Sequence, residues 1–322
     1  MSYFLFKRIF TLIATLAATS VIVFAVLEVL PGNAAQVLMG PDADPAAVAA
    51  KATELGLDQP ALHRYLTWMS GLLRGDMGLS YTYGSPVSEL ILERLQLTVP
   101  LAVMAMLLTT AIALAVGVYA AARHNSAVDV GLMSMAQVGI AIPNFWFAIL
   151  LILLFSVKLQ WFSAGGFDGW YFEDGVWLGL WEGLKALILP AVALAVVQAA
   201  ILARFTRSAV LEVLREDFVR TARAKGLSHR ATLWGHVLRN AMIPVITVMG
   251  LQFAELLAGT IVVENVFYLP GLGRLIFQSI ANRDVIVVRN CVMLLAAMVV
   301  IVNFVVDVLY AVIDPRVKAS EI

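Results

Sequence analysis

The sequence predicts an all-α integral membrane protein with six transmembrane helices. Its 322 residues are 61% hydrophobic, and their mean hydropathy is +0.89. Only 14% of the residues are charged, and acidic and basic side chains are equal in number. This composition is typical of membrane proteins and makes nucleic acid an unexpected partner. Six apolar segments are long enough to cross a hydrocarbon core about 30 Å thick, which takes about 20 helical residues.

The predicted spans cover residues 9–30, 99–122, 130–157, 186–203, 243–263 and 290–313. Three of them contain a single acid each, which are Glu28, Glu255 and Asp307, and the other three contain no charge. Backbone polar groups in lipid must be satisfied within the segment, so we expect helices. The first apolar run is longer than that of a signal peptide and no clean Ala-x-Ala site ends it, so we expect an uncleaved helix.

The positions of the basic residues predict that both termini face the cytoplasm. With that orientation, thirteen of the 22 lysines and arginines lie on the cytoplasmic side. Basic residues favour that side in membrane proteins. Eight of the thirteen lie between Arg204 and Arg239, in a loop that spans residues 204–242. The tail at residues 314–322 is then also cytoplasmic.

Residues 31–96 predict a helical insert on the outer face. Asp44 and Pro45 are suited to begin one helix, which stops before Gly56. A second begins near Pro60 and places on one face Leu62, Leu66, Met69 and Leu73. Ser85-Pro86 opens a third, which carries toward the second span Leu90, Ile91 and Leu95. The insert is either a structural lid over the helix ends or a docking platform, and both interpretations stay open.

The basic stretch "VRTARAKGLSHR" at residues 219–230 predicts a helix–Gly–helix hairpin. Residues 218–225 can form two helical turns with Phe218 and Ala222 on one side, and Gly226 permits a left-handed stop. A second short helix carries an apolar stripe of Leu233, Trp234, Val237 and Leu238. The hairpin suits a groove on a soluble partner, because arginines form forked bonds to carboxylates. A loop that binds anionic lipid and only sets topology is the alternative, and composition leaves both open.

The stretch "VRTARAKGLSHRATLWGHVLRNAMIPVITVMG" resembles the cytoplasmic signature of permease subunits of ABC importers, in the dipeptide/oligopeptide branch. Arg220, Thr221 and Ala222 stand where that signature has Glu-Ala-Ala, and Gly226 and Ile243-Pro244 occupy its later positions. The first two residues depart from the general triplet. Five further stretches resemble the same branch in order along the chain: residues 55–80, 86–102, 142–155, 262–276 and 310–318.

The resemblance implies a type I ABC importer-like permease in the bacterial cytoplasmic (inner) membrane. It implies as partners a second homologous permease, two ABC ATPase subunits and an extracytoplasmic solute-binding protein, within the lipid bilayer. ATP and Mg²⁺ are expected at the ATPases, because this chain contains no P-loop and is expected to be neither an enzyme nor a holder of cofactor or metal. The implied ATPase-coupling residues are Phe218, Arg220, Thr221, Ala222, Arg223, Ala224, Lys225, Gly226, Leu227, His229 and Arg230.

Polar residues inside the spans are candidates for the substrate path, because an unpaired polar group in lipid is costly and usually faces a cavity. The principal candidates are Asn144, Gln198, Gln252 and Glu255, with Gln137, Asn303 and Asp307 as further ones. Glu255 either attracts a cationic or amine-bearing substrate or makes an interhelical hydrogen bond. Pairing or snorkelling explains Glu28 and Asp307 more simply. Glu264 and "PGLGR" at residues 270–274 suit an outer loop or a plain turn.

The expected function is ATP-driven import, in which this chain forms half of the translocation path for peptides or peptide-like solutes. Nickel complexes, glutathione, muropeptides and oligosaccharides are alternatives within the branch. A stand-alone secondary transporter or channel is an alternative of another class, but the sequence shows no convincing internal repeat. The expected organisation is a first segment at 1–30, the insert at 31–96, a core at 97–313 with the coupling loop 204–242, and the tail at 314–322.

Overall fold

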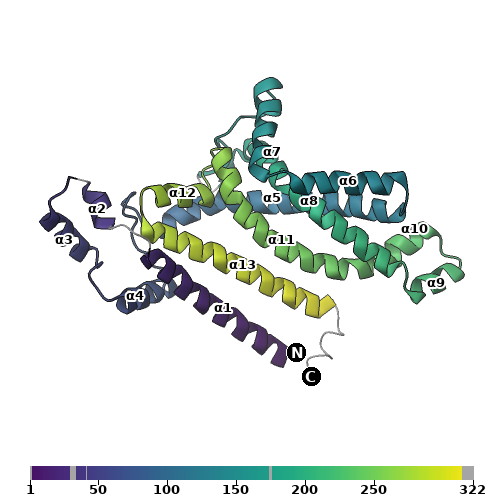
Figure 1. The fold of residues 1–322 in the computed structure, drawn as a ribbon, viewed down its shortest axis with the longest axis horizontal. Coiled ribbons are helices and arrows are strands. Elements are labelled where there is room, and N and C mark those ends of the chain that lie inside the picture. Colours follow the sequence, from purple (N-terminus) through teal and green to yellow (C-terminus); the bar gives the residue numbers. More distant parts are fainter. Residues whose placement is uncertain (1, 30–33, 41, 174–175, 314–322) are drawn as a thin grey trace. The chain divides into compact units, whose positions relative to one another are not determined.

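A computed structural model describes residues 2–29, 34–40, 42–173 and 176–313, and these are almost entirely helical (Figure 1). Among the described residues, the only strands are β1 (Tyr171–Glu173) and β2 (Val176–Leu178), which pair antiparallel. The predicted all-α class is therefore confirmed. The tail at 314–322 lies outside the described residues.

Five of the six predicted spans are single long helices. They are α1 (Ser2–Val29), α5 (Val87–Ala122), α8 (Leu180–Val213), α11 (Leu238–Val266) and α13 (Val285–Ile313). Each contains a segment long and apolar enough to cross a membrane. Arg8 of α1 pairs with Asp307 of α13 at 3.0 Å, so the start of α1 lies beside the last turns of α13. This contact agrees with two termini on the same side and with the predicted pairing of Asp307.

The predicted uninterrupted span at 130–157 is wrong. The chain forms α6 (Ala127–Ala141), then α7 (Asn144–Leu151), which continues as the π-helix η1 (Ile152–Lys158), with a 99° bend between the two parts. The cause is Pro143, which disfavours a helical conformation of the residue before it. Ile142 is accordingly extended, with φ −86° and ψ 122°. The bend places Asn144 at the start of a new helix.

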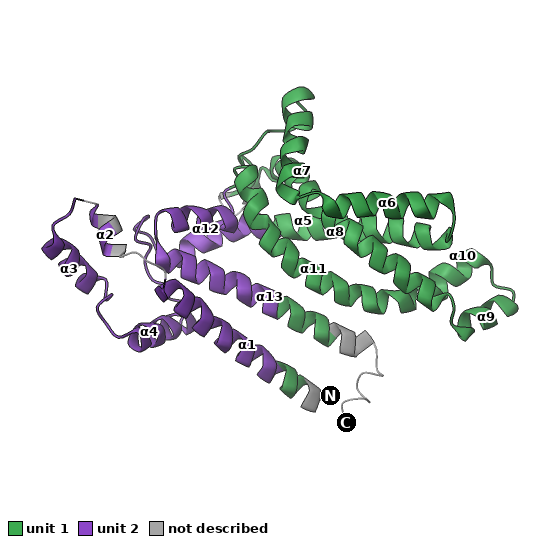
Figure 2. Cartoon of the chain, in the orientation of Figure 1, with its two compact units in different colours: residues 1–8, 100–269, 301–322 green, residues 9–99, 270–300 purple. Residues whose placement is uncertain are grey.

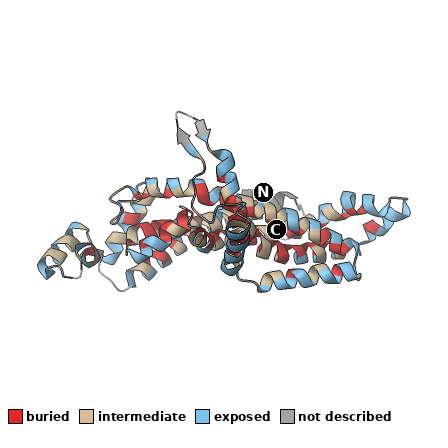
Figure 3. Cartoon of the chain, turned by 90° about the horizontal axis from the view of Figure 1, so that it is seen from above, coloured by how far each residue is buried: buried red, intermediate tan, exposed pale blue. Residues whose placement is uncertain are grey.

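Two compact units make up the chain, and Figure 2 colours them separately. The first comprises residues 1–8, 100–269 and 301–322. Within it, α8 packs against α6, α7 and α11, and buried side chains lie along its length (Figure 3). Close contact between α5 and α8 depends on Gly117, since a Cβ there would lie 2.7 Å from the carbonyl oxygen of Ala203. Small residues allow helix backbones in membranes to approach in this way.

The second unit comprises residues 9–99 and 270–300. It contains the short helices α2 (Ala34–Met39), α3 (Pro45–Glu54), α4 (Ala61–Leu73) and α12 (Leu272–Ala281). One core joins residues of α5, α12 and α13, including the buried Cys291. A second core joins α1, α4 and α13 around Phe24 and Trp68, and the Trp68 indole donates to the Asn290 amide oxygen at 3.0 Å.

The insert is helical, but one of its predicted details is wrong. Asp44 does cap α3, by accepting from the Ala46 N–H at 3.1 Å, and Pro60 does precede α4. Leu62, Leu66, Met69 and Leu73 share one face of α4 as predicted, and three of them, Leu62, Leu66 and Leu73, are exposed. Trp68 is the buried residue of α4, and Tyr65 packs beside it in the core around Phe24. The predicted third helix is not separate, since α5 continues from Val87 through Pro100 into the second span.

Candidate functional site

The predicted basic hairpin forms at the end of α8. We define the α9–α10 hairpin as residues 217–237, which comprise α9 (Asp217–Ala224), the turn at Gly226, α10 (His229–Thr232) and the π-helix η2 (Leu233–Val237). Asp217 lies in the first turn of α9 and Arg223 in the last. Both positions suit the helix dipole, which favours acids at the N-terminus and bases at the C-terminus.

A Schellman turn at Gly226 ends α9. The Gly226 N–H donates to the carbonyl of Arg223 at 2.9 Å, and the Leu227 N–H donates to that of Ala222 at 3.3 Å. These two bonds satisfy carbonyls that a helix end leaves without partners. Gly226 has φ +91°, and a Cβ there would meet no atom within 4 Å. Glycine is required at this position by the backbone conformation and not by space.

The second half of the hairpin begins at Ser228, whose hydroxyl accepts from the Ala231 N–H at 3.2 Å as a helix cap. The following turn is a π-helix, which continues directly into α11. Leu233 and Val237 are buried, whereas Trp234 is 64% exposed. The predicted apolar stripe is therefore wrong for Trp234. The wider π turn places Leu233 and Val237 inward and leaves the indole outside.

The inner face of the hairpin belongs to the core of the first unit. Val219, Ala222, Leu233 and Val237 lie in one buried cluster with residues of three long helices, namely Val118 and Ala121 of α5, Ala209 and Val210 of α8, and Ala241 and Val245 of α11. Closely packed interiors transmit displacement because they do not deform continuously. A movement of the hairpin must therefore move the ends of these helices.

The outer face of the hairpin is rich in cations and apolar side chains, and it also exposes the acid Asp217. Exposed there are Trp234 and ten of the predicted coupling residues, which are Phe218, Arg220, Thr221, Arg223, Ala224, Lys225, Gly226, Leu227, His229 and Arg230. The ion pair of Arg220 with Asp217, at 3.5 Å, is almost fully solvent-exposed, so it restrains the guanidinium little. Phe218 and Ala222 do not share a side as predicted, because Ala222 faces the core and Phe218 is 42% exposed. Val219 takes the inward position with Ala222.

Three of the four principal substrate-path candidates lie together where α8 and α11 pack. The side-chain amide of Gln252 donates to the backbone carbonyl of Gln198 at 3.0 Å, and the amide of Gln198 donates to the Glu255 carboxylate at 3.2 Å. Gln198 and Gln252 are buried, whereas Glu255 is exposed at the surface of this chain. The interhelical hydrogen bond foreseen for Glu255 is therefore present, and its carboxylate also remains accessible.

The same cluster contains amide oxygens that have no donor. The side-chain oxygens of Asn144, Gln198 and Gln252 are buried without a hydrogen-bond partner. Asn144 lies at the start of α7 beside Gly259, one helical turn beyond Glu255 on α11, because its Nδ2 is 3.7 Å from the Cβ position at Gly259. Buried acceptors without donors cost free energy, so these amide oxygens along α11 could receive N–H groups.

The remaining polar candidates are placed elsewhere. Gln137 accepts from Arg204 at 3.0 Å near the hairpin end of α8. Glu28 pairs with Arg64, which agrees with the simpler explanation by pairing. Glu264 does not lie in a loop, because it is buried in the last turn of α11. Within the described residues, no three His, Cys, Asp or Glu side chains lie close enough together to hold a metal ion.

A buried ion pair near the hairpin was not foreseen from the sequence. Arg207 of α8 donates to both carboxylate oxygens of Asp129 on α6, from Nε at 2.6 Å and from Nη2 at 2.7 Å. The Asp129 side chain is 3% exposed. Forked arginine–carboxylate bonds of this kind fix geometry as well as charge. The single sequence signal was an acid directly before the predicted span at 130–157.

Comparisons with known proteins show the family. Residues 113–319 match the family described as binding-protein-dependent transport system inner membrane component, and residues 1–102 match its N-terminal family. A dipeptide transport system permease protein of Alkalihalophilus pseudofirmus is 38% identical over 97% of this chain and 98% of its own. A glutathione transport system permease protein of Escherichia coli is 41% identical over 98% of both chains.

A di/tripeptide transport system permease protein of Pseudomonas aeruginosa is 40% identical, again over 98% of both chains. Among solved structures, an inward-facing MetNI methionine ABC transporter aligns with a TM-score of 0.55 over 70% of this chain and 96% of that chain, at 17% identity. This last likeness concerns the fold alone. The chain belongs to the family of inner membrane components of binding-protein-dependent transport systems.

Proposed function

We propose that this permease forms half of the translocation path for peptides or peptide-like solutes and is driven by ATP through the α9–α10 hairpin. One observation carries the proposal. The hairpin's inner face is part of the same buried core as α5, α8 and α11, while its outer face presents cations and aromatic side chains to a partner. A segment that transmits movement from a partner needs both properties, a rigid connection to the membrane helices on one side and an accessible contact surface on the other.

The partners of the proposed importer are a second homologous permease, two ABC ATPase subunits and an extracytoplasmic solute-binding protein. ATP and Mg²⁺ bind to the ATPases, since this chain has no P-loop sequence. Arg220, Arg223 and Arg230 orient the hairpin in an ATPase cleft, where their guanidinium groups meet carboxylates. Phe218, Leu227 and Trp234 supply apolar contacts at the same surface, in keeping with the enrichment of aromatic residues and arginine at interfaces.

The translocation path of the proposed importer passes the cluster of Asn144, Gln198, Gln252 and Glu255. The exposed Glu255 carboxylate attracts a cationic or amine-bearing solute, and the amide oxygens accept hydrogen bonds from N–H groups. Peptides carry both a charged amine and amide N–H groups. The names of the Alkalihalophilus and Pseudomonas relatives support a peptide substrate.

The test is uptake of a labelled dipeptide into proteoliposomes that contain all the subunits. Uptake should require ATP and should be lost when the Walker lysines of the ATPases are replaced. A cysteine placed at Arg220 should crosslink to an ATPase subunit, whereas one placed at Leu62 on α4 should not. Uptake by this chain without ATPases would contradict the proposal and would indicate a stand-alone transporter.

Glutathione is a second candidate substrate, because the Escherichia coli relative is named a glutathione transport permease and is 41% identical. Glutathione is itself a tripeptide with an amine and several amide N–H groups, so the same acceptor cluster suits it. Unlabelled glutathione should reduce uptake of the labelled dipeptide in the reconstituted system if it is also a substrate, and should leave that uptake unchanged if it is not. Ligand profiling of the solute-binding protein separates both from nickel complexes, muropeptides and oligosaccharides.

A further inference from the structure

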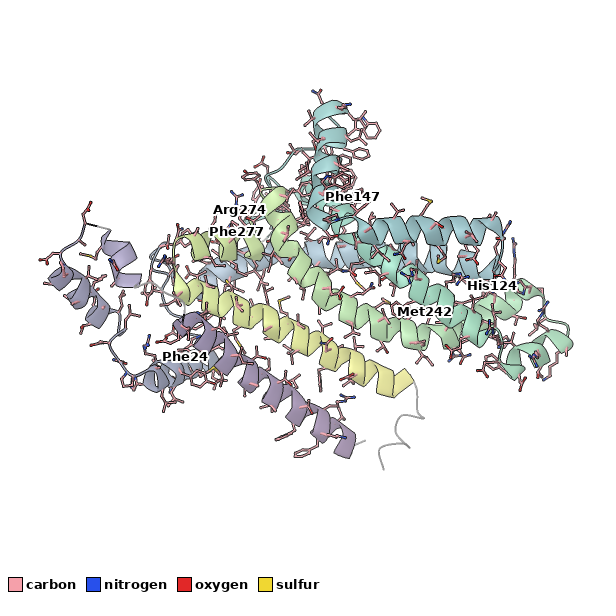
Figure 4. All side chains as sticks on the ribbon, in the orientation of Figure 1. Phe24, His124, Phe147, Met242, Arg274 and Phe277 are labelled. Carbon is pink, nitrogen blue, oxygen red and sulfur yellow. The ribbon has the colours of Figure 1, made fainter. Side chains whose placement is uncertain are left out.

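A groove runs between α6 and α8 in the first unit, near the α9–α10 hairpin. It consists of two adjoining cavities, of about 370 Å³ and 560 Å³, which share Met133 and Arg207 as lining residues. The groove extends along α6 from Asn125, directly after the His124 that Figure 4 labels, to Ile140. None of the predicted coupling residues and none of the four principal substrate-path candidates line either cavity, whereas Gln137, a further candidate, lines the smaller one.

The larger cavity changes from apolar to polar along the two helices. The helices run in opposite directions, with α6 leading away from the hairpin end and α8 leading toward it. Ile140 and Ile201 therefore line the part farther from the hairpin, Arg204 and Phe205 follow along α8, and Arg207 and Ser208 line the nearer part. This order matches that of a phospholipid, whose acyl chains lie deeper in the bilayer than its phosphate.

The groove carries an excess of positive charge. The forked bonds between Arg207 and Asp129 neutralise that pair. Arg204, which lines the larger cavity, donates to the uncharged amide oxygen of Gln137 at 3.0 Å. No carboxylate pairs with Arg204 within the described part of the chain. One guanidinium charge therefore remains for an anionic ligand, and basic pockets between membrane helices suit anionic headgroups.

We propose that this groove binds an anionic phospholipid. The lipid phosphate accepts hydrogen bonds from the Arg204 guanidinium and the Ser208 hydroxyl, and an acyl chain packs along Ile140, Ile201 and Phe205. A free phosphate ion would leave this apolar wall without a partner, so a lipid is the better fit. The site lies beside α8, one of the three long helices that share the hairpin's buried core, and a bound lipid would hold α6 against α8 close to the hairpin.

Native mass spectrometry of the delipidated full-length chain, purified with its co-expressed partner subunits, tests the proposal by titration with phosphatidylglycerol. We expect Arg204→Gln to weaken retention of phosphatidylglycerol roughly tenfold, the effect of losing one charge-assisted hydrogen bond. Arg204→Lys should retain most of the binding, which excludes misfolding as the cause. Arg215→Gln is the matched control, because Arg215 is an exposed arginine outside the groove, and it should bind as the unmodified protein does.

Four results would overturn the inference. Phosphatidylcholine could be retained as strongly as phosphatidylglycerol, which would remove the preference for an anion. Inorganic phosphate could displace the lipid at equal concentration, or Phe205→Ala could leave lipid retention unchanged, and either would remove the role of the acyl chain. A thiol introduced as Ser208→Cys could stay unreactive toward a water-soluble maleimide after delipidation, which would mean that protein covers the groove; the native Cys291 is buried.

Discussion

The Leu227 N–H donates to the carbonyl of Ala222 at 3.3 Å, and this bond closes the turn between the two halves of the α9–α10 hairpin. The bond requires a left-handed conformation at Gly226, the residue before Leu227. The geometry of the proposed ATPase contact therefore depends on one backbone conformation, which links the turn directly to coupling.

Gly226→Val should lower ATP-driven uptake and substrate-stimulated ATPase activity while the long helices stay folded. A β-branched residue at this φ costs about 1–2 kcal/mol, a factor of roughly 5–30 in the population of the turn. Gly226→Asn should have a smaller effect, because asparagine tolerates the left-handed region. Gly131→Ala on α6 is the control, since a Cβ there meets nothing within 4 Å and its φ is not positive. Equal uptake by the valine and control variants would contradict the prediction.

Substitutions at the adjacent residues Leu233 and Trp234 should affect different properties, the first stability and the second partner binding. Leu233 is 5% exposed and Trp234 is 64% exposed. Leu233→Ala should lower the free energy of unfolding by about 2–5 kcal/mol, because it opens a cavity in the core. Trp234→Ala should change stability by less than about 0.5 kcal/mol and should reduce the amount of ATPase that copurifies. Thermal unfolding and affinity copurification measure the two effects. The reverse assignment, with Trp234→Ala the destabilising variant, would show that the indole is a core residue.

Hydropathy alone predicted five of the spans, because the length of an apolar run is set by bilayer thickness and does not depend on tertiary packing. The 99° bend at Pro143 was missed, since "IPN" also occurs within continuous spans when neighbours satisfy the freed backbone groups. The direction in which α4 faces could not be predicted for a different reason. Its leucines and its aromatic residues lie on two different faces, and the partners on α1 and α13 decide which face is covered.

The sequence predicted where the hairpin lies along the chain, but it did not predict which of its side chains point inward or outward. The Gly226 turn followed from local sequence chemistry. The outward direction of Trp234 depends on a π turn that the spacing of apolar residues does not reveal. The pairing of Asp129 with Arg207 joins positions 78 residues apart, so it depends on how α6 packs on α8. Long-range pairings of this kind are not encoded in a local pattern.

Asp129→Asn should lower the unfolding temperature of the purified chain. The substitution leaves the Arg207 guanidinium without its carboxylate, and hydrogen bonds to charged groups contribute about 1.5–3 kcal/mol each. Arg207→Gln should have a similar effect. In a double-mutant cycle, the two together should cost less than the sum of the single substitutions, because both remove the same interaction. Strict additivity would mean that the two residues do not interact.

Gln252→Leu should reduce uptake without reducing stability. Gln252 is 3% exposed, and although its amide nitrogen donates to the Gln198 carbonyl, its side-chain oxygen has no donor. The substitution removes the donor to the Gln198 carbonyl, a bond worth about 0.5–1.5 kcal/mol, but it also removes a buried oxygen that has no donor, so the net change in the free energy of unfolding is expected to be small. If the oxygen accepts an N–H group from the passing solute, its removal should slow uptake by roughly tenfold, the effect of one hydrogen bond of about 1.4 kcal/mol.

Thr206→Val is the control, because Thr206 is equally buried and its hydroxyl bonds only within its own helix, to Leu202. Normal uptake by a correctly folded Gln252→Leu variant would place the translocation path elsewhere, whereas a large loss of stability would show that the amide is a structural bond between α8 and α11.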